Sequence, residues 1–417
     1  MLHGIEAETQ DCDLGDARLD RRYRVLLSRL DAQAGRSSPA ACRSRAEIQA
    51  AYRFFDPPRV TPERLRAPHR AATQRRMAAE KVVVVAQDTT EIDLTRPARV
   101  VGGPLATASR TGFFSHVLWA VTPTGVPLGV LADPTWARDP ETVGHSTERP
   151  KQQPLAEKES VRWIEGDRPC CETARAVPGT EVICVSDSEG DLSEAFVEAQ
   201  TQRHAAKFMV RACQNRRLAG VEQQYLREFV ASTPVVGTRR VSVSRRRAKA
   251  SETRTRRQSR GDREAVLTIP VATVTPRTPW RCDGKLPEVP VTVVLAREAN
   301  PPAGEEPIEW LLLTDLPATT KAEAERVLDL YELRWQIEVY FRVLTSGCQV
   351  EQLQRETAER MLNALVRYQI VAWRVLLVTM LGRACPDWPC DAVLEEAEWK
   401  SVSVVVVRKK LPKRVPQ

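Results

Sequence analysis

Three acidic residues stand where an α/β protein places its chemistry. Asp88 follows the apolar run 81 to 87, Asp187 follows the run 182 to 186, and Glu338 lies in a predicted helix far downstream. Acidic residues at the carboxyl ends of central strands are typical of active sites in α/β sheets. We therefore predict that two neighbouring strand ends and one covering helix bring the three carboxylates together. The alternative is three unrelated acids, two in loops and one on a solvated helix face.

Clustered carboxylates raise one another's pKa unless cations neutralise them. Hard divalent ions such as Mg²⁺ do this through oxygen ligands, and they retain waters and phosphate oxygens as further ligands. Two such ions roughly 4 Å apart activate the attacking oxygen and stabilise the leaving oxygen in phosphoryl transfer. The three acids thus make metal-dependent phosphoryl transfer a plausible chemistry.

Residues 331 to 347 predict an amphipathic helix that presents Glu338. At about 100° per residue, one side of this helix carries Tyr331, Arg334, Glu338 and Thr345. The opposite side carries an apolar stripe of Leu333, Ile337, Tyr340 and Leu344. Tyr331 and Arg334 would then contact the phosphate being transferred. The simpler alternative is a surface helix on which Arg334 and Glu338 form an i, i+4 ion pair.

Length and charge indicate a multidomain protein with a polyanionic partner. The 417 residues allow two or three domains. The formal net charge of +8 weakly favours nucleic acid as the partner. The ten cysteines and five histidines show neither a disulfide framework nor zinc-ligand spacing, so free thiols in a reducing cytoplasm are expected. The N-terminal residues show no basic-then-apolar pattern, so no signal segment is expected. The apolar run 361 to 381 contains two arginines, which predicts a core helix rather than a membrane span.

Residues 1 to about 75 predict three helices. A Gly-Arg-Ser-Ser-Pro break separates the first two, and Thr61-Pro62-Glu63 caps the third. Five arginines on these helices could grip DNA phosphates or could simply be solvated: Arg18, Arg21, Arg22, Arg53 and Arg59.

Residues 76 to 211 predict an α/β core. The expected order is a strand ending at Asp88, a hairpin of 113 to 121 and 126 to 132, a helix, a strand ending at Ser186, a helix of 192 to 202, and a strand of 207 to 211. This alternation is typical of a mixed sheet with helices on both sides.

Residues 212 to 309 predict antiparallel β-structure with a strongly basic run. Between Arg239 and Arg263 the chain carries eleven basic and two acidic residues, among them Arg245 and Arg246. Such a run is either a solvated loop or a contact for a phosphate backbone, which would neutralise the repelling charges. A last apolar strand, 310 to 314, then leads into a helix from about 321 to 345 and another from about 358 to 382.

The ordered motifs resemble those of the bacterial insertion-sequence transposases of the DDE class, in the branch with a Tyr-x-x-Arg-x-x-x-Glu signature. The matching motifs run along nearly the whole chain: Leu14-Gly-Asp-x-Arg18, Ala51-Tyr-Arg-Phe54, Gln87-Asp-Thr-Thr90, Glu157-Lys-Glu-Ser160, Asp187-x-Glu-x-Asp191, Trp310-Leu-Leu-Leu-Thr314 and Tyr331-x-x-Arg334-Trp335-x-Ile337-Glu338. Each motif is weak alone, whereas this many in order is a specific signal.

The resemblance implies an RNase H-like mixed sheet flanked by helices, with a helical DNA-end-binding domain at 1 to 75. The catalytic core would span 76 to 211 and 310 to 382 around a β-rich basic insertion at 212 to 309, followed by a C-terminal segment at 383 to 417. The metal-binding triad would be Asp88, Asp187 and Glu338, with Mg²⁺ as the cofactor and Mn²⁺ as its substitute. The residues expected to contact DNA are Tyr331, Arg334, Trp310, Trp335, Arg211, Arg18, Arg53, Arg245 and Arg246.

The family's reaction gives the expected activity: nicking at element ends, hairpin formation and opening, and strand transfer into target DNA. Trp310 resembles the residue that packs on a flipped base, while its structural alternative is a core tryptophan on an apolar strand. The expected partners are terminal inverted repeats, target DNA and a second copy in a synaptic complex. The expected location is the bacterial cytoplasm, on the nucleoid, with no membrane.

Two departures from the family keep other functions open. Thr345 stands where the family's signature has Lys, and the sequence lacks the helices that usually follow for pairing two subunits. The chain is therefore expected to be a cut-and-paste transposase or, alternatively, a truncated DNA-binding remnant that occupies element ends and inhibits transposition. A general RNase H-fold nuclease would explain the three acids but not the matches at Tyr331, Arg334 and Trp310.

Overall fold

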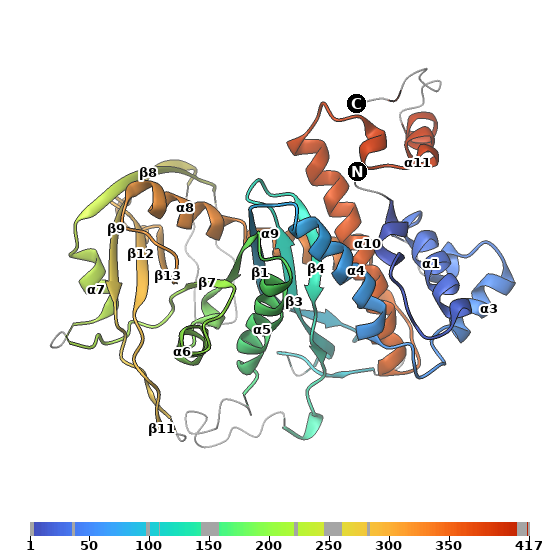
Figure 1. Cartoon of the computed structure of the whole chain (residues 1–417), viewed down its shortest axis with the longest axis horizontal. Coiled ribbons are helices and arrows are strands. Elements are labelled where there is room, and N and C mark those ends of the chain that lie inside the picture. Colours follow the sequence, from blue (N-terminus) through green and yellow to red (C-terminus); the bar gives the residue numbers. More distant parts are fainter. Residues whose placement is uncertain are drawn as a thin grey trace. The chain divides into compact units, whose positions relative to one another are not determined.

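The computed structural model describes residues 4–35, 38–96, 101–107, 109–142, 158–220, 224–245, 261–281, 284–406 and 415. It divides into two compact units (Figure 1). The first consists of Met1–Glu148, Arg168–Val182 and Trp335–Gln417, and the second of Arg149–Asp167 and Ile183–Arg334.

The first unit begins with helices. They are the 3-10 helix η1 (Ile5–Thr9) and the α-helices α1 (Ala17–Asp31), α2 (Ser38–Ala41), α3 (Arg45–Arg53) and α4 (Pro62–Met77). The predicted start of α4 is confirmed, because the Thr61 side chain accepts a hydrogen bond from the Arg64 N–H and Pro62 occupies the first turn.

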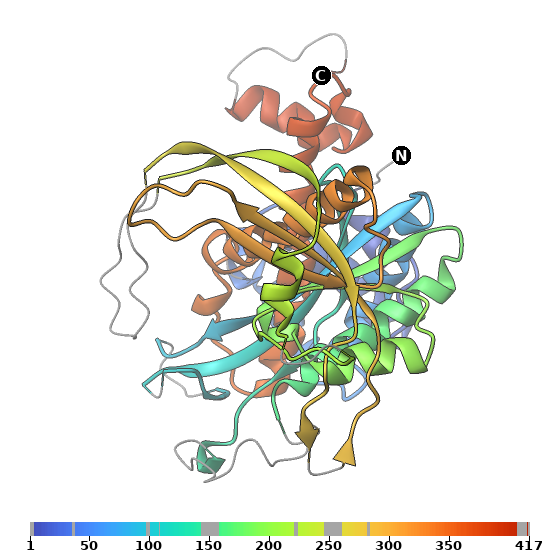
Figure 2. The same cartoon turned by 90° about the vertical axis from the view of Figure 1, so that its left-hand side faces the viewer.

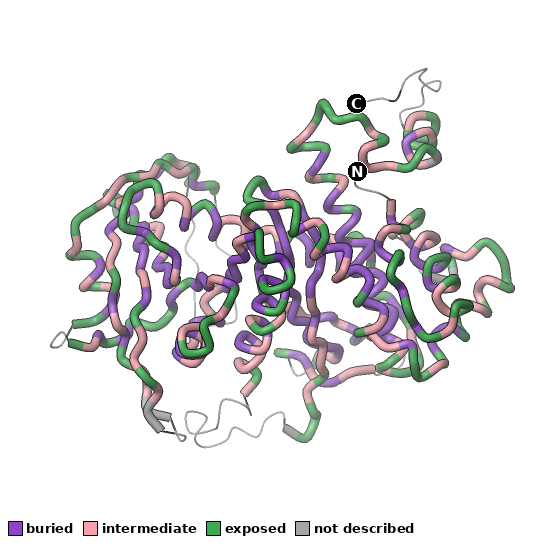
Figure 3. Tube along the Cα trace, in the orientation of Figure 1, coloured by how far each residue is buried: buried purple, intermediate pink, exposed green. Residues whose placement is uncertain are grey.

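The strands of the first unit surround one central strand, β3 (Thr111–Val121). It pairs antiparallel with β1 (Val82–Asp93), β2 (Gly103–Pro104), β4 (Pro127–Ala132) and β5 (Thr135–Trp136). The predicted β3–β4 hairpin is confirmed, and Gly125 in its turn has a φ of +87°, a conformation that glycine adopts without strain. α4 and α10 (Ala358–Ala384) pack against β4, and Figure 3 shows that β1, β3 and α10 are largely buried.

β1 is longer than the sequence predicts. The expected end at Asp88 is wrong, because residues 88 to 93 continue the ladder with β3, from Asp88 opposite Val117 to Asp93 opposite Gly112. Thr89, Thr90 and Ile92 are β-branched and suit a paired strand. Asp88 therefore lies in the middle of a strand rather than at its end.

The second unit contains a mixed sheet in the order β6, β7, β13, β12, β9, β8. These strands are β6 (Glu181–Ser186), β7 (Lys207–Arg211), β8 (Val235–Val243), β9 (Arg263–Val274), β12 (Val291–Glu298) and β13 (Glu309–Thr314). β6 and β7 are parallel, and the other neighbouring pairs are antiparallel. In Figure 2 the strands β8, β9, β12 and β13, yellow-green to orange, lie beside one another as a curved layer.

The predicted β-rich segment 212 to 309 shares a core with the strands around it. β13 pairs with β7 on one side and with β12 on the other. One hydrophobic cluster includes Phe208 of β7, Leu313 of β13, Val293 of β12 and Leu226 of α7 (Leu226–Ala231). α6 (Ser193–Thr201) contributes Phe196 to the same cluster, and α8 (Lys321–Glu332) packs against β8 and β9.

The single helix predicted from 321 to 345 is wrong. α8 ends at Glu332, α9 (Trp335–Arg342) begins after a turn, and a π-helical segment (Val343–Gly347) follows. At the break the Arg334 N–H donates to the Tyr331 carbonyl, three residues back, instead of continuing the α-helical ladder. Local sequence gives no stop signal here, so the break reflects tertiary context, which commonly overrides helix propensity.

The remaining helices complete the description. They are α5 (Val161–Ala176), which crosses from one unit to the other, α11 (Glu396–Ser401) and a π-helical segment (Val402–Val406). Minor elements are the 3-10 turns Pro140–Thr142, Ser188–Gly190, Val350–Gln352 and Cys390–Ala392, and the strand pair Trp280–Arg281 and Gly284–Lys285. Among the described residues, α10 alone is long and apolar enough to cross a membrane, and 78% of its most apolar window is buried in the protein.

Candidate active site and DNA-binding residues

Asp88 is held by the strands that flank it in the first unit. The Asp88 carboxylate is half-buried and accepts a hydrogen bond from the Thr89 N–H at 2.8 Å. The buried ring of His116 connects the residues on either side, with Nδ1 2.8 Å from the Thr89 hydroxyl and Nε2 3.0 Å from Gln87 Oε1. This chain of contacts fixes the orientation of the strand around Asp88.

Glu338 lies on α9, which packs against the strand that carries Asp88. Three residues of the predicted apolar stripe, Ile337, Tyr340 and Leu344, are fully buried, whereas the fourth, Leu333, is half-buried and precedes α9. The Tyr340 ring stacks on Trp119 of β3 with centroids 4.3 Å apart. Glu338 itself is half-buried on the other side of the helix. Asp88 and Glu338 therefore belong to one packed strand-and-helix arrangement within the first unit.

Asp187 lies in the second unit, directly after β6. Its carboxylate caps the following 3-10 turn by accepting a hydrogen bond from the Glu189 N–H at 2.8 Å. Ser186 pairs with Val210 of the parallel strand β7, so Asp187, directly after β6, and Arg211, the last residue of β7, lie at the same edge of the sheet. Arg211 is exposed, and its guanidinium donates to the Glu309 carbonyl at 3.3 Å.

Tyr331 and Arg334 belong to the same neighbourhood in the second unit. Burial raises the pKa of the Tyr331 phenol, while the charges of Arg334 and Arg211 and a hydrogen bond with Arg334 act in the opposite direction, and Asp187 raises the pKa further. Arg334 is 9% exposed, so the solvated surface helix considered as an alternative is wrong at this residue. The phenol and guanidinium are thus held together within reach of the charges of Asp187 and Arg211.

Trp310 completes this cluster. Its ring is only half-buried on β13, with its centroid 6.1 Å from the Tyr331 ring. The next residues of the strand, 311 to 314, are fully buried. Trp310 is therefore more exposed than the strand residues that follow it. The cluster of Asp187, Arg211, Trp310, Tyr331 and Arg334 combines a carboxylate, two cations, a phenol and an indole.

The remaining predicted DNA contacts fall in different settings. Arg18 on α1 and Arg53 on α3 are exposed, and Arg18 pairs with Asp16 at 3.3 Å. Trp335 is 61% exposed at the start of α9. Arg245 is exposed and its backbone N–H bonds Asp262, whereas Arg246 lies outside the described residues.

The two ends of the basic run are neutralised within the protein. Arg239 pairs with Asp329 at 2.5 Å and with Glu332 at 2.9 Å, both on α8. Arg263 pairs with Glu298 at 2.8 Å and with Glu305 at 2.5 Å. For these two arginines the expectation of repelling charges that need a phosphate backbone is wrong, because nearby carboxylates already balance them. Residues 246–260 lie outside the described residues.

Asp191, the last residue of the Asp187 motif, anchors the segment after Arg211. The Asp191 carboxylate accepts from the backbone N–H groups of Cys213 at 2.8 Å and Gln214 at 3.0 Å, and it pairs with Arg216 at 2.5 Å. The motif contained this residue, but nothing in the sequence revealed its partners.

The triad as a whole remains a prediction. Asp88 and Glu338 belong to the first unit and Asp187 to the second. Across the described ranges, no group of three or more His, Cys, Asp or Glu side chains is arranged to hold a metal ion.

Comparison with known proteins identifies the family. Residues 4–60 match the family model of transposase DNA-binding segments, and residues 167–373 match that of the transposase DDE domain. Arg18 and Arg53 fall inside the first match, and Asp187 and Glu338 inside the second, while Asp88 lies outside both.

One solved structure similar to the chain is a piggyBac transposase synaptic complex with hairpin DNA. It is 11% identical with a TM-score of 0.34, and the match covers 91% of this chain and 64% of that one. The two family models lead to one conclusion: this chain belongs to the DDE transposases, and its large mixed sheet flanked by helices is consistent with the RNase H-like core expected from the sequence.

Proposed function

We propose that this transposase cuts DNA at the ends of a bacterial insertion sequence and joins the freed ends to target DNA. The observation that carries the proposal is the cluster in the second unit, where Asp187 shares a sheet edge with Arg211 near Tyr331 and Arg334. Carboxylate, guanidinium and phenol groups in one place suit a phosphodiester in an in-line displacement. The full reaction would be nicking, hairpin formation, hairpin opening and strand transfer.

Asp88, Asp187 and Glu338 would hold Mg²⁺, with Mn²⁺ as a substitute. Their chemistry fits a hard divalent ion, because all three are carboxylates that are half-buried rather than sealed in the core. Backbone N–H groups orient one oxygen of Asp88 and one of Asp187. When bound, the metal would activate the attacking oxygen and stabilise the leaving oxygen.

The remaining residues of the cluster would bind and orient the DNA end. Arg334 and Arg211 would neutralise the phosphate next to the cut, with Tyr331 holding the Arg334 guanidinium in place through their hydrogen bond. The half-exposed Trp310 ring would stack on a base turned out of the duplex. Trp335 offers a second exposed indole immediately after Arg334.

Cleavage of a duplex that carries the element's terminal inverted repeat would test this function. Wild-type protein is expected to nick at the element boundary when Mg²⁺ is added. Asp88→Ala, Asp187→Ala and Glu338→Ala should abolish nicking and retain end binding, and Glu325→Ala on α8 serves as the control outside the site. Loss of binding in the three variants, or nicking that survives them, would contradict the assignment.

A DNA-binding remnant that blocks element ends is the second candidate. Thr345 favours it, since no cation stands at this position and its hydroxyl donates to the Phe341 carbonyl at 2.9 Å inside the π-helical segment. Such a remnant would bind the element end specifically without nicking it, and it would inhibit an active transposase when the two proteins are mixed. Cleavage of an unrelated duplex at a rate similar to that of the element-end duplex would instead indicate a general nuclease.

A further inference from the structure

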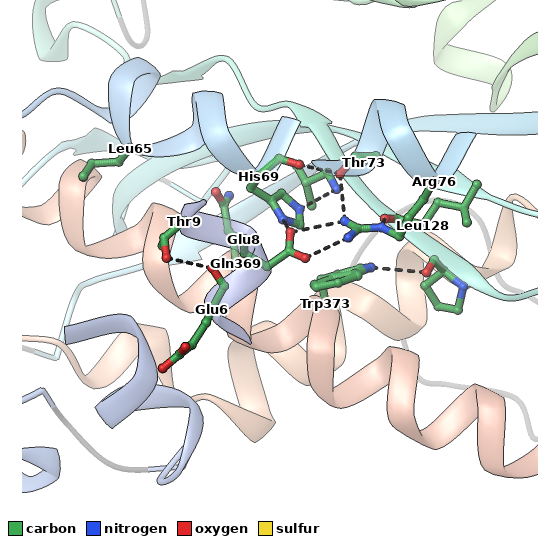
Figure 4. Close-up of polar contacts among 12 residues, drawn as sticks. Glu6, Glu8, Thr9, Leu65, His69, Thr73, Arg76, Leu128, Gln369 and Trp373 are labelled. Atoms are coloured by element: carbon green, nitrogen blue, oxygen red, sulfur yellow. Dashed lines mark hydrogen bonds and ion pairs between the residues drawn. The ribbon is translucent and has the colours of Figure 1, made fainter. Parts of the chain in front are cut away.

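A fully buried carboxylate, Glu8, connects the DNA-binding segment to the sheet that carries Asp88 (Figure 4). Glu8 lies on η1, inside the region matched by the DNA-binding model, and is 1% exposed. Its two oxygens contact His69 Nδ1 at 2.5 Å and the Arg76 guanidinium at 2.7 and 3.2 Å. Both partners lie on α4.

The partners of Glu8 reach onward to β4. The Val130 N–H donates a hydrogen bond to His69 Nε2 at 3.0 Å. We therefore assign the ring proton to Nδ1, whose N–H donates a hydrogen bond to the Glu8 carboxylate. Arg76 Nε donates to the Leu128 carbonyl at 2.6 Å. Two side chains on α4 therefore link one carboxylate to two positions of the same strand.

Trp373 of α10 closes the network from the other side. The Arg76 guanidinium lies 4.3 Å from the centre of its ring, and the His69 ring packs edge-on against it with centroids 5.0 Å apart. The Trp373 indole N–H donates to the Pro127 carbonyl at 3.3 Å. Every polar group of this contact thus has a partner, which makes the arrangement stiff.

The path from β4 to the candidate active site runs through paired strands. Val130 pairs with Trp119 on β3, and Val117, two residues before Trp119, pairs with Asp88 on β1. A hydrogen-bonded ladder transmits a displacement of one strand to its neighbours because interiors are close-packed. A movement of the N-terminal segment away from β4 is also a movement away from Asp88.

We propose that Glu8 is a positioning residue that sets which phosphate of the bound DNA end reaches Asp88. This inference rests on the proposed function, since it concerns the position of the cut. Successive phosphates along one strand are about 3.4 Å apart in rise, so a shift of that size moves the cut by one nucleotide. The buried clamp of Glu8, His69 and Arg76 prevents such shifts.

Mapping nicks at single-nucleotide resolution on the end duplex would test the clamp, with Glu8→Gln compared with Glu6→Gln. Glu6 lies on the same 3-10 helix but is exposed, so it controls for charge removal. Wild type and Glu6→Gln should nick at one phosphate. Glu8→Gln should spread its nicks over that phosphate and its neighbours. A variant that is only less stable would nick less DNA at the same place.

Arg76→Lys provides a second variant. It keeps a cation next to Glu8 and leaves the contact between Glu8 and His69 intact, but it removes the two hydrogen bonds that the guanidinium donates to Glu8. It should also spread the nicks, to a smaller degree, and its circular dichroism should match wild type. Single-position nicking by both variants would overturn the clamp while leaving the proposed function standing. Absence of nicking by wild type would overturn both.

Discussion

Individual carboxylates of this chain fall into two environments. Asp191 and Glu8 are almost completely buried, and each is saturated with backbone, arginine or histidine partners. Asp88, Asp187 and Glu338 are half-buried and accessible to a ligand. A buried carboxylate with fixed partners suits positioning, whereas a partly exposed one can accept a metal ion or change its partners during a reaction.

Asp191→Ala should destabilise the second unit strongly. The change leaves the Arg216 guanidinium, with 5% of its side chain exposed, without its carboxylate, and it removes the acceptor for two backbone N–H groups. Breaking one partner of a buried pair costs about 3–5 kcal/mol. Urea unfolding would measure this loss. The double variant Asp191→Ala/Arg216→Met should recover part of the stability, because no unpaired charge remains buried. Equal losses in both variants would mean that the ion pair is not the cause.

The buried pair of Glu8 and His69 should make the first unit sensitive to acid. Burial alone raises the pKa of Glu8, but the charges and hydrogen bonds of His69 and Arg76 lower it to about 2 from an ordinary 4.5. Burial lowers the pKa of His69, while the charge and the hydrogen bond of Glu8 act to raise it. As the pH is lowered, both residues therefore take up protons more readily in the unfolded chain than in the folded one. The free energy of unfolding consequently decreases as the pH decreases.

The contribution of Glu8 should be fully present above pH 4.5 and lost as the pH falls toward 2. Its size is on the order of 3 kcal/mol. The unfolding free energies of wild type and Glu8→Gln should therefore differ most near neutral pH. They should converge as the pH falls below the pKa of the Glu8 carboxyl in the unfolded chain. Glu6→Gln should follow wild type throughout. A gap between wild type and Glu8→Gln that does not change with pH would contradict this account.

At the scale of elements, the broken helix shows what local sequence could not predict. Residues 321 to 345 contain good helix formers without Gly or Pro, so their periodicity predicted one helix with Tyr331, Arg334 and Glu338 on one side. The structure instead ends α8 one residue after Tyr331 and begins α9 after Arg334. Both side chains are buried at the break, a condition that only the folded chain provides and that the local sequence does not signal.

The paired strands show the opposite case. The bounds of β7 and the β3–β4 hairpin followed from apolar runs and a Gly turn, because burial and turn chemistry are local signals. The extension of β1 beyond Asp88 required its partner strand, which residue types alone do not specify. The clamp of Glu8 and His69 left no sequence signal, since the two residues are 61 positions apart.

The basic run from Arg239 to Arg263 should contribute to DNA binding through its interior arginines rather than through Arg239 and Arg263 themselves. Arg239 and Arg263 are occupied by carboxylates of the protein. In the double variant Arg245→Gln/Arg246→Gln, a plot of the logarithm of the DNA-binding constant against the logarithm of the salt concentration should be less steep by up to about 2. Each arginine that binds a phosphate contributes about 0.9 to the steepness of this plot. Arg239→Gln should lower thermal stability and leave the slope unchanged. If only Arg239→Gln changed the slope, the assignment of these arginines would be reversed.

At the scale of the whole molecule, charge should couple subunit pairing to DNA. With a formal net charge of +8, two free copies repel each other, whereas duplex DNA supplies the compensating phosphates. We therefore expect the proposed synaptic pair, two copies with two end duplexes, to form only when DNA is present and to weaken as salt increases. Mass photometry with end duplexes of two different lengths would count copies and ends in each complex. Unrelated duplex of equal length, which offers the same charge without the end sequence, is the matched control. A stable dimer without DNA at low salt would show that a protein surface, and not charge compensation, drives pairing.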